Sequence, residues 1–207
     1  MSGPAVALSV AGPVAVAVAW LLVRRGVSLW LVNGTLIPVL GILALATGEF
    51  ELTRGKSATI SVLVGVAAGI GLYLATRAFM AVASRWAPLS RHAAALYENR
   101  GAMPLWAEVA IAAFLVAIGE ELLWRGLVLE SLEPRFSPPV LGVGLAWLAY
   151  VVANAVSGSI PVVLGAVVGG ATWTALAVTG YGVAASIGCH AAWTALMVVF
   201  PPIRRRL

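Results

Sequence analysis

The sequence predicts an all-α fold, a polytopic transmembrane helical bundle of about seven membrane helices with one further helix at the membrane surface. Of the 207 residues, 61% are hydrophobic and only 10% are charged, whereas an ordinary soluble domain carries roughly 25% charged residues. The mean hydropathy is +1.00. Apolar runs of about 20 residues, the length that spans a bilayer, recur along the chain.

Short charged or turn-forming segments separate the predicted spans. The spans cover residues 4–23, 27–47, 57–83, 105–129, 139–156, 160–178 and 182–200. Short Gly- or Ser-containing turns join the last three spans, so we expect these to form a compact antiparallel run. The chain then divides into N-terminal membrane helices (1–83), a connector (84–104), a core four-helix bundle (105–200) and a basic tail (201–207).

The connector mixes charged with apolar side chains. It carries Arg85, Arg91, His92, Glu98 and Arg100 among Ala, Leu and Trp residues. A helix with one charged and one apolar face lies in the membrane interface rather than across it. We therefore expect an interfacial amphipathic helix here.

Basic residues are distributed unevenly between the two sides of the predicted bundle. With the N-terminus outside, the cytoplasmic side holds Arg24, Arg25, Arg77, Arg85, Arg91, Arg100, Arg204, Arg205 and Arg206, and the outer side holds Arg54, Lys56 and Arg135. The positive-inside rule then predicts an N-out, C-in orientation. It also puts the C-terminal end of the fourth span, which carries Glu120, on the outside.

Composition excludes other kinds of protein. The net charge of +5 does not indicate a nucleic-acid partner, because the basic residues sit at helix ends and not along one stripe. Cys189 is the only cysteine, so there is no disulfide framework and no thiolate metal site. The chain has no Asp, which excludes an aspartyl intramembrane protease.

The fourth span carries the charged residues Glu120, Glu121 and Arg125 between residues 105–118, which are nearly all apolar, and a second apolar stretch. Charged groups at membrane depth cost several kcal/mol unless they are paired or hydrated, so they are candidates for a functional site. Glu121 and Arg125 are four residues apart and can pair on one helix face. Glu120 lies about 100° around the helix, has no partner of its own there, and suits the role of a general base.

Two later spans each carry a polar pair with the same spacing, Tyr150 with Asn154 and His190 with Thr194. A buried polar side chain without a partner costs roughly 1–3 kcal/mol. The arrangement of lowest cost therefore turns all three polar sets toward one interior pocket.

These three motifs, in this order and on these helices, resemble the CPBP (CAAX protease and bacteriocin-processing, or Abi) family of intramembrane endopeptidases over residues 105–200. The resemblance implies a protease in which Glu120 activates the attacking water and Glu121 with Arg125 forms a structural pair. It also implies a multi-pass protein of the bacterial plasma membrane. Its partners would be the lipid bilayer and a membrane-associated or lipidated peptide substrate.

Two positions depart from the family pattern. The second motif is usually Phe-x-x-x-His and reads Tyr150 to Asn154 here; the third is usually His-x-x-x-Asn or Asp and reads His190 to Thr194. A catalytic zinc normally has three protein ligands, and only Glu120 and His190 are candidates, so the sequence predicts at most a weakly bound divalent metal such as zinc. Asn154 can still donate to an oxyanion, and His190 can donate or shuttle a proton.

Other interpretations stay open at this point. A catalytically weakened or inactive relative would act as a membrane binding, immunity or regulatory protein through the same pocket. A small proton-coupled transporter is disfavoured because no inverted repeat is evident. Asn154 can also serve as a hydrogen-bonding contact between helices, His190 as a core histidine, and Tyr150 and Thr194 as packing or capping groups.

Overall fold

The computed structural model describes residues 1–98 and 101–202. The predicted contributions of Arg100 and of Arg204, Arg205 and Arg206 lie outside the described residues. Within them the chain is helical and contains no strand. The prediction of an all-α polytopic bundle is confirmed.

The first four helices are α1 (Gly3–Arg24), α2 (Leu29–Ala46), α3 (Ala58–Ala83) and α4 (Ala87–Glu98). The fourth predicted span is a succession of α5 (Leu105–Val109), η1 (Ala110–Val116), α6 (Ala117–Glu121), η2 (Leu122–Val128) and α7 (Leu129–Leu132), followed by the short η3 (Glu133–Arg135). The last helices are α8 (Pro139–Ala155), α9 (Ile160–Leu164), η4 (Gly165–Gly169), α10 (Gly170–Ala177) and α11 (Gly182–Val199).

Five helices among the described residues are long and apolar enough to cross a membrane: α1, α2, α3, the run from Ile160 to Ala177, and α11. The other two predicted spans are the shorter apolar helix α8 and the run from α5 to α7. That run alternates α-helical turns with the π-helical segments η1 and η2. The chain is an integral, multi-pass membrane protein.

Local signals in the sequence set several helix boundaries. The hydroxyl of Ser28 accepts a hydrogen bond from the backbone N–H of Leu31 and caps α2, and Ser57 caps α3 in the same way through Ile60. Gly26, with a φ of 93°, turns the chain immediately after α1. Only glycine adopts this left-handed conformation without a steric cost.

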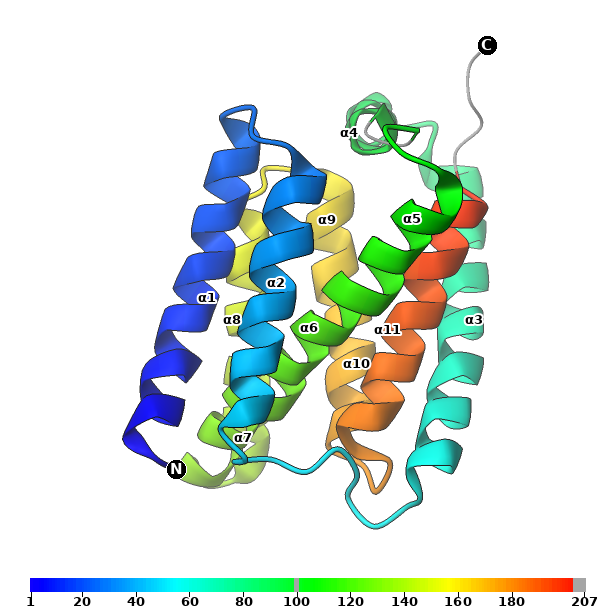
Figure 1. The fold of residues 1–207 in the computed structure, drawn as a ribbon. Coiled ribbons are helices and arrows are strands. Elements are labelled where there is room, and N and C mark those ends of the chain that lie inside the picture. The colour runs from blue at the N-terminus through cyan, green and yellow to red at the C-terminus, as the bar shows by residue number, and fades with distance from the viewer. Residues whose placement is uncertain (99–100, 203–207) are drawn as a thin grey trace.

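The α5–α7 run crosses the bundle obliquely, between α2 and α11 (Figure 1). Two glycines bring α2 and α6 into close contact, because a Cβ added to Gly41 would lie 2.5 Å from Cα of Gly119. A similar close contact joins α3 to α11, where a Cβ on Gly65 would lie 2.1 Å from the carbonyl oxygen of Ala185. Small residues therefore position the two helices that carry Glu120 and His190.

Helix α4 lies across one end of the bundle (Figure 1). Its apolar residues Leu89 and Ala93 are buried against Met80 and Ile160. We call this the basic end of the bundle, because four arginines lie there. Arg24 and Arg25 are at the end of α1, Arg85 follows α3, and Arg91 is on α4. It is the end that the charge count predicts to face the cytoplasm.

Candidate active site

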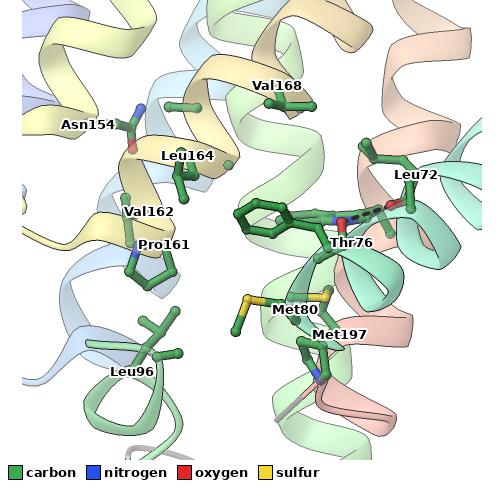
Figure 2. Close-up of a pocket in the computed structure, with 18 of the residues that line it drawn as sticks. Leu72, Thr76, Met80, Leu96, Asn154, Pro161, Val162, Leu164, Val168 and Met197 are labelled. Carbon is green, nitrogen blue, oxygen red and sulfur yellow. Dashed lines mark hydrogen bonds between the residues drawn. The ribbon is translucent and has the colours of Figure 1, made fainter. Parts of the chain in front are cut away.

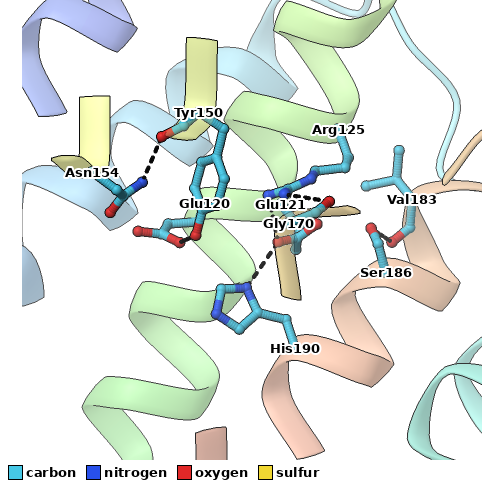
Figure 3. A network of polar contacts seen from close by, with 9 residues as sticks. All are labelled: Glu120, Glu121, Arg125, Tyr150, Asn154, Gly170, Val183, Ser186 and His190. Carbon is cyan, nitrogen blue, oxygen red and sulfur yellow. Dashed lines mark hydrogen bonds and ion pairs between the residues drawn. The ribbon is translucent and has the colours of Figure 1, made fainter. Parts of the chain in front are cut away.

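Three helical runs bring the predicted site residues together inside the bundle (Figure 3). Glu120, Glu121 and Arg125 come from α6 and η2, Tyr150 and Asn154 from α8, and His190 from α11. All six side chains are buried. The common polar interior expected from the sequence is therefore present.

Glu121 is the centre of a charged network. Nη1 of Arg125 donates to Oε1 of Glu121 at 3.0 Å, the pair that the spacing of four residues predicts. Nδ1 of His190 lies 2.8 Å from the same oxygen. Nη2 of Arg125 donates to the carbonyl oxygen of Gly170 at 3.2 Å. Glu121 is completely buried and links α11 to the α5–α7 run.

Glu120 receives a different partner. The hydroxyl of Tyr150 donates to Oε2 of Glu120 at 2.9 Å. The sequence offered no partner for Glu120 on its own helix, and the structure supplies one from α8. Tyr150 therefore takes part in the polar site in addition to packing.

Aromatic rings hold the charged groups in place. The guanidinium of Arg125 lies 4.3 Å from the ring centroid of Tyr150 and 5.3 Å from that of Trp173. The ring of His190 stacks on Trp173 with centroids 3.6 Å apart and an angle of 15° between the planes. Stacking and the bond to Glu121 together fix the orientation of the imidazole, with Nε2 as the nitrogen left for other contacts.

Asn154 is largely engaged by the protein. Its Oδ1 accepts from Nε1 of Trp20 at 3.0 Å, and its Nδ2 donates to the backbone oxygen of Tyr150 at 3.0 Å. The amide thus joins α1 to α8. Because a primary amide has two N–H donors, one N–H of Asn154 has no partner among the described residues.

Thr194 does not join this network. Its Oγ1 is buried, and no group in the described part of the chain makes a hydrogen bond to it. The residue instead lines a cavity beside the site. Of the seven predicted site residues, Thr194 is the one that the polar network leaves out.

Two cavities meet at His190. The larger, of about 470 Å³, is lined mainly by apolar side chains, including Leu72, Met80 and Leu164, and reaches Tyr150 and Asn154 (Figure 2). We call it the apolar cavity. The smaller, of about 260 Å³, is lined by Asn33, Glu108, Glu120, Thr194 and His190, with apolar residues between them. We call it the polar cavity.

Both cavities extend toward the basic end of the bundle. Leu96 and Tyr97 of α4 line both of them. Glu120 lies near the middle of the α5–α7 run and not at its far end. The cavities therefore lie on the side of the site that the charge count predicts to be cytoplasmic. The C-terminal end of the α5–α7 run lies at the opposite end of the bundle (Figure 1).

Sequence reasoning missed Glu108. Residues 105–118 are nearly all apolar, but the exception, Glu108, lies on α5, is only 1% exposed and lines the polar cavity. Its Oε1 accepts a hydrogen bond from the backbone N–H of Gly101. A charged residue in an apolar span is energetically costly, and this cost marks Glu120 as a candidate site residue. The same argument applies to Glu108, so the sequence contained the signal that could have identified it.

The residues of the site do not fit a three-ligand zinc centre. Among the described residues, no three side chains of His, Cys, Asp or Glu are placed to share one ion. Glu121 accepts from Arg125 and His190, and Glu120 accepts from Tyr150.

Fold and site together define a polytopic helical membrane protein with a buried Glu–Glu–Arg–His network beside two cavities. Residues 102–196 match the family model for the Type II CAAX prenyl endopeptidase Rce1-like proteins. The matched segment begins just before α5, ends near the end of α11 and contains the site, and the match supports membership of the CPBP family. No curated protein and no solved structure gave a significant match.

Proposed function

We propose that this protein is an intramembrane endopeptidase of a bacterial plasma membrane that hydrolyses a peptide bond with water activated by Glu120. The family match supports a protease of the CAAX type. The observation that carries the proposal is the difference between two adjacent carboxylates. Glu121 is completely buried and bonded to Arg125 and His190, whereas Glu120 lines the polar cavity and accepts one bond from a neutral hydroxyl.

In the proposed reaction, Glu120 removes a proton from a water molecule, and the water oxygen bonds to the carbonyl carbon of the substrate. The carbonyl π electrons move to the carbonyl oxygen. The oxyanion electrons then re-form the C=O bond as the C–N bond breaks, and the proton held by Glu120 passes to the nitrogen of the leaving amine. A carboxylate that faces a cavity suits both transfers, as in general acid–base catalysis.

Two donors are available for the developing oxyanion. One is the remaining N–H of Asn154, which the bond to Trp20 holds in a fixed direction. The other is Nε2 of His190, which donates when the ring is protonated and accepts a proton when the ring is neutral. Donors fixed in advance stabilise an oxyanion without reorganisation during the reaction.

The cavities favour a membrane-associated or lipidated peptide as the substrate. The apolar cavity has room for an apolar group and lies next to Asn154 and His190. The polar cavity holds Glu120. A substrate that fills both would bring an apolar anchor and a peptide bond to the same histidine.

Cleavage of a membrane-anchored peptide library by the purified protein in liposomes tests the proposal. Glu120→Gln removes the base and should abolish cleavage. Glu130→Gln is the matched control, because Glu130 lies on the same helical run but bonds to Arg54 away from both cavities. Cleavage by Glu120→Gln at the wild-type rate would rule out the proposed role of Glu120.

A second candidate is a catalytically weakened family member that binds a membrane partner, as an immunity or regulatory protein would. Two observations favour it: the amide of Asn154 is mostly used by Trp20 and Tyr150, and the hydroxyl of Thr194 has no partner in the described part of the chain. The double change Asn154→His and Thr194→Asn restores the usual family residues. Proteolysis gained by this variant supports a weakened site, whereas turnover by the wild type contradicts an inactive one.

A further inference from the structure

The polar cavity contains a buried carboxylate that the proposed reaction does not use. Glu108 is 1% exposed and lines the cavity from α5. The backbone N–H of Gly101 donates to its Oε1 and orients the side chain. No described residue forms an ion pair with Glu108. A buried carboxylate in this state stabilises a positive charge brought into the cavity.

Glu108 and Glu120 lie on the same wall of the cavity. The residues Glu108, Ala112, Val116 and Glu120 all line it at intervals of four. In a regular α-helix each step of four residues drifts by about 40°, so Glu120 would face about 120° away from Glu108. The wider π-helical turns of η1 reduce this drift and keep the four residues on one wall.

The opposite wall supplies an independent observation. Oγ1 of Thr194, on α11, is buried at the cavity and has no partner among the described residues. No described Lys or Arg lines the cavity. Between the two carboxylates the wall is apolar, formed by Ala112 and Val116. This apolar wall ends at the carboxylate of Glu108. Such a surface suits a long side chain that has an apolar alkyl part and a positively charged end group.

We propose that the polar cavity is a subsite for a positively charged group of the substrate, a Lys or Arg side chain, and that Glu108 recognises it. That the charged group belongs to a peptide substrate rests on the proposed function. Glu120 follows Glu108 by twelve positions, which corresponds to at most about 18 Å along the axis at the α-helical rise. An extended peptide covers about 3.5 Å per residue. The basic residue then lies about three to five positions from the cleaved bond, because its own side chain covers part of the distance.

Charged thiol reagents test the charge preference of the cavity without any cleavage. In a Cys189→Ala background, Ala112→Cys and Val116→Cys each place one thiol on the cavity wall. The probes are the cationic aminoethyl and the anionic sulfonatoethyl methanethiosulfonates, with rates normalised to free cysteine. The cationic reagent should react about tenfold faster or more, the size expected for a hydrogen bond to a charged group.

Variants of Glu108 separate its effect from that of other groups. Glu108→Gln keeps an oxygen for the N–H of Gly101 and should lower the normalised ratio of rates several-fold, most strongly at Ala112→Cys, while Glu120 still favours the cationic reagent; Glu108→Lys should lower the ratio further. Phe114→Cys, on the lipid-facing side of the same run at 58% exposure, is the control and should not respond to changes at residue 108. The proposal is overturned by equal rates for both reagents, by no labelling at either position, or by a ratio that Glu108→Gln leaves unchanged.

Peptide cleavage then tests the substrate directly. Library peptides with Lys, Gln or Glu at positions up to about five residues from the cleaved bond should differ in kcat/KM, with Lys preferred by wild-type protein. Glu108→Gln should remove this preference while Gln-containing peptides are still cleaved. Absence of all cleavage would contradict the proposed function and not the charge preference, because the labelling experiment measures that preference by itself.

Discussion

Nδ1 of His190 lies 2.8 Å from Oε1 of Glu121, the second of two adjacent carboxylates (Figure 3). The same oxygen accepts from Arg125. Glu121 thus serves the structure of the site, while Glu120 remains at the polar cavity with Tyr150. Neighbouring residues of the same type should therefore respond to the same substitution in different ways.

Glu121→Gln should destabilise the protein strongly. The change leaves the buried guanidinium of Arg125 without its counter-charge, and breaking a buried ion pair from one side costs about 3–5 kcal/mol. Thermal unfolding in detergent, followed by near-UV circular dichroism, measures the loss. Arg125 and His190 are then expected to lose their fixed orientation.

Glu120→Gln is the matched control for stability. An amide oxygen at residue 120 can still accept from the hydroxyl of Tyr150, so the unfolding temperature should stay close to that of the wild type. Equal destabilisation by Glu120→Gln and Glu121→Gln would contradict the separate roles of the two carboxylates.

Tyr150→Phe should lower the rate of cleavage about tenfold or more and leave the fold intact. The change removes a hydrogen bond to a carboxylate, which is worth about 1.5–3 kcal/mol, but keeps the ring that contacts Arg125 and lies 5.2 Å from Trp124. The measurement is kcat together with the unfolding temperature.

Tyr73→Phe removes a tyrosine hydroxyl from a different place. Its hydroxyl donates to the backbone oxygen of Phe200 at 2.9 Å, away from Glu120. Cleavage by this control should stay at the wild-type rate. If both variants lowered kcat equally, the bond between Tyr150 and Glu120 would have no special part in the reaction.

Glu49, in the loop after α2, contacts the start of the chain in a way that depends on pH, and its Oε2 lies 3.6 Å from the N-terminal ammonium. The backbone N–H of Ser2 donates to its carboxylate and lowers the pKa of Glu49 from its ordinary 4.5. A carboxylate with a lowered pKa stabilises the folded contact above its unfolded-state pKa, and the contribution is lost as pH falls through the folded-state value. Attachment of the start of α1 should therefore weaken below pH 4.5.

Hydrogen–deuterium exchange at Ser2, corrected for the intrinsic effect of pH, measures this contact. Protection should decrease as pH falls below 4.5 in the wild type. Glu49→Gln cannot titrate and should show no such transition. A transition that persists in Glu49→Gln would assign the effect to another group.

The parts of the structure that follow from local sequence were predictable. Apolar runs ending at turn or cap residues, such as Gly26 and Ser57, located the spans because membrane length and helix capping act on consecutive residues. The Glu121–Arg125 pair was predictable because residues four apart share a helix face.

The contacts made between helices were not predictable in detail. The bonds of Tyr150 to Glu120 and of His190 to Glu121 depend on how α8 and α11 pack against α6. The alignment of Glu108 with Glu120 depends on the π-helical turns of η1, which no simple sequence period indicates. The sequence indicates which residues are polar and which helix face they share. It does not indicate which side-chain atoms form hydrogen bonds between helices.

Gly119→Ala should disturb the site through the backbone. A Cβ at residue 119 would lie 2.7 Å from the carbonyl oxygen of Ile37, so α2 and α6 would have to separate. Overpacking of this kind costs about 1–3 kcal/mol. Since Gly119 immediately precedes Glu120 and Glu121, we expect a lower unfolding temperature together with a loss of cleavage.

Gly144→Ala makes the same substitution where space is free. Gly144 is exposed on α8, and a Cβ there would meet nothing within 4 Å. Because Ala favours a helix over Gly by about 1 kcal/mol, this control should unfold at the wild-type temperature or slightly above it and cleave normally. If Gly119→Ala behaved in the same way, close contact between α2 and α6 would not be what positions Glu120.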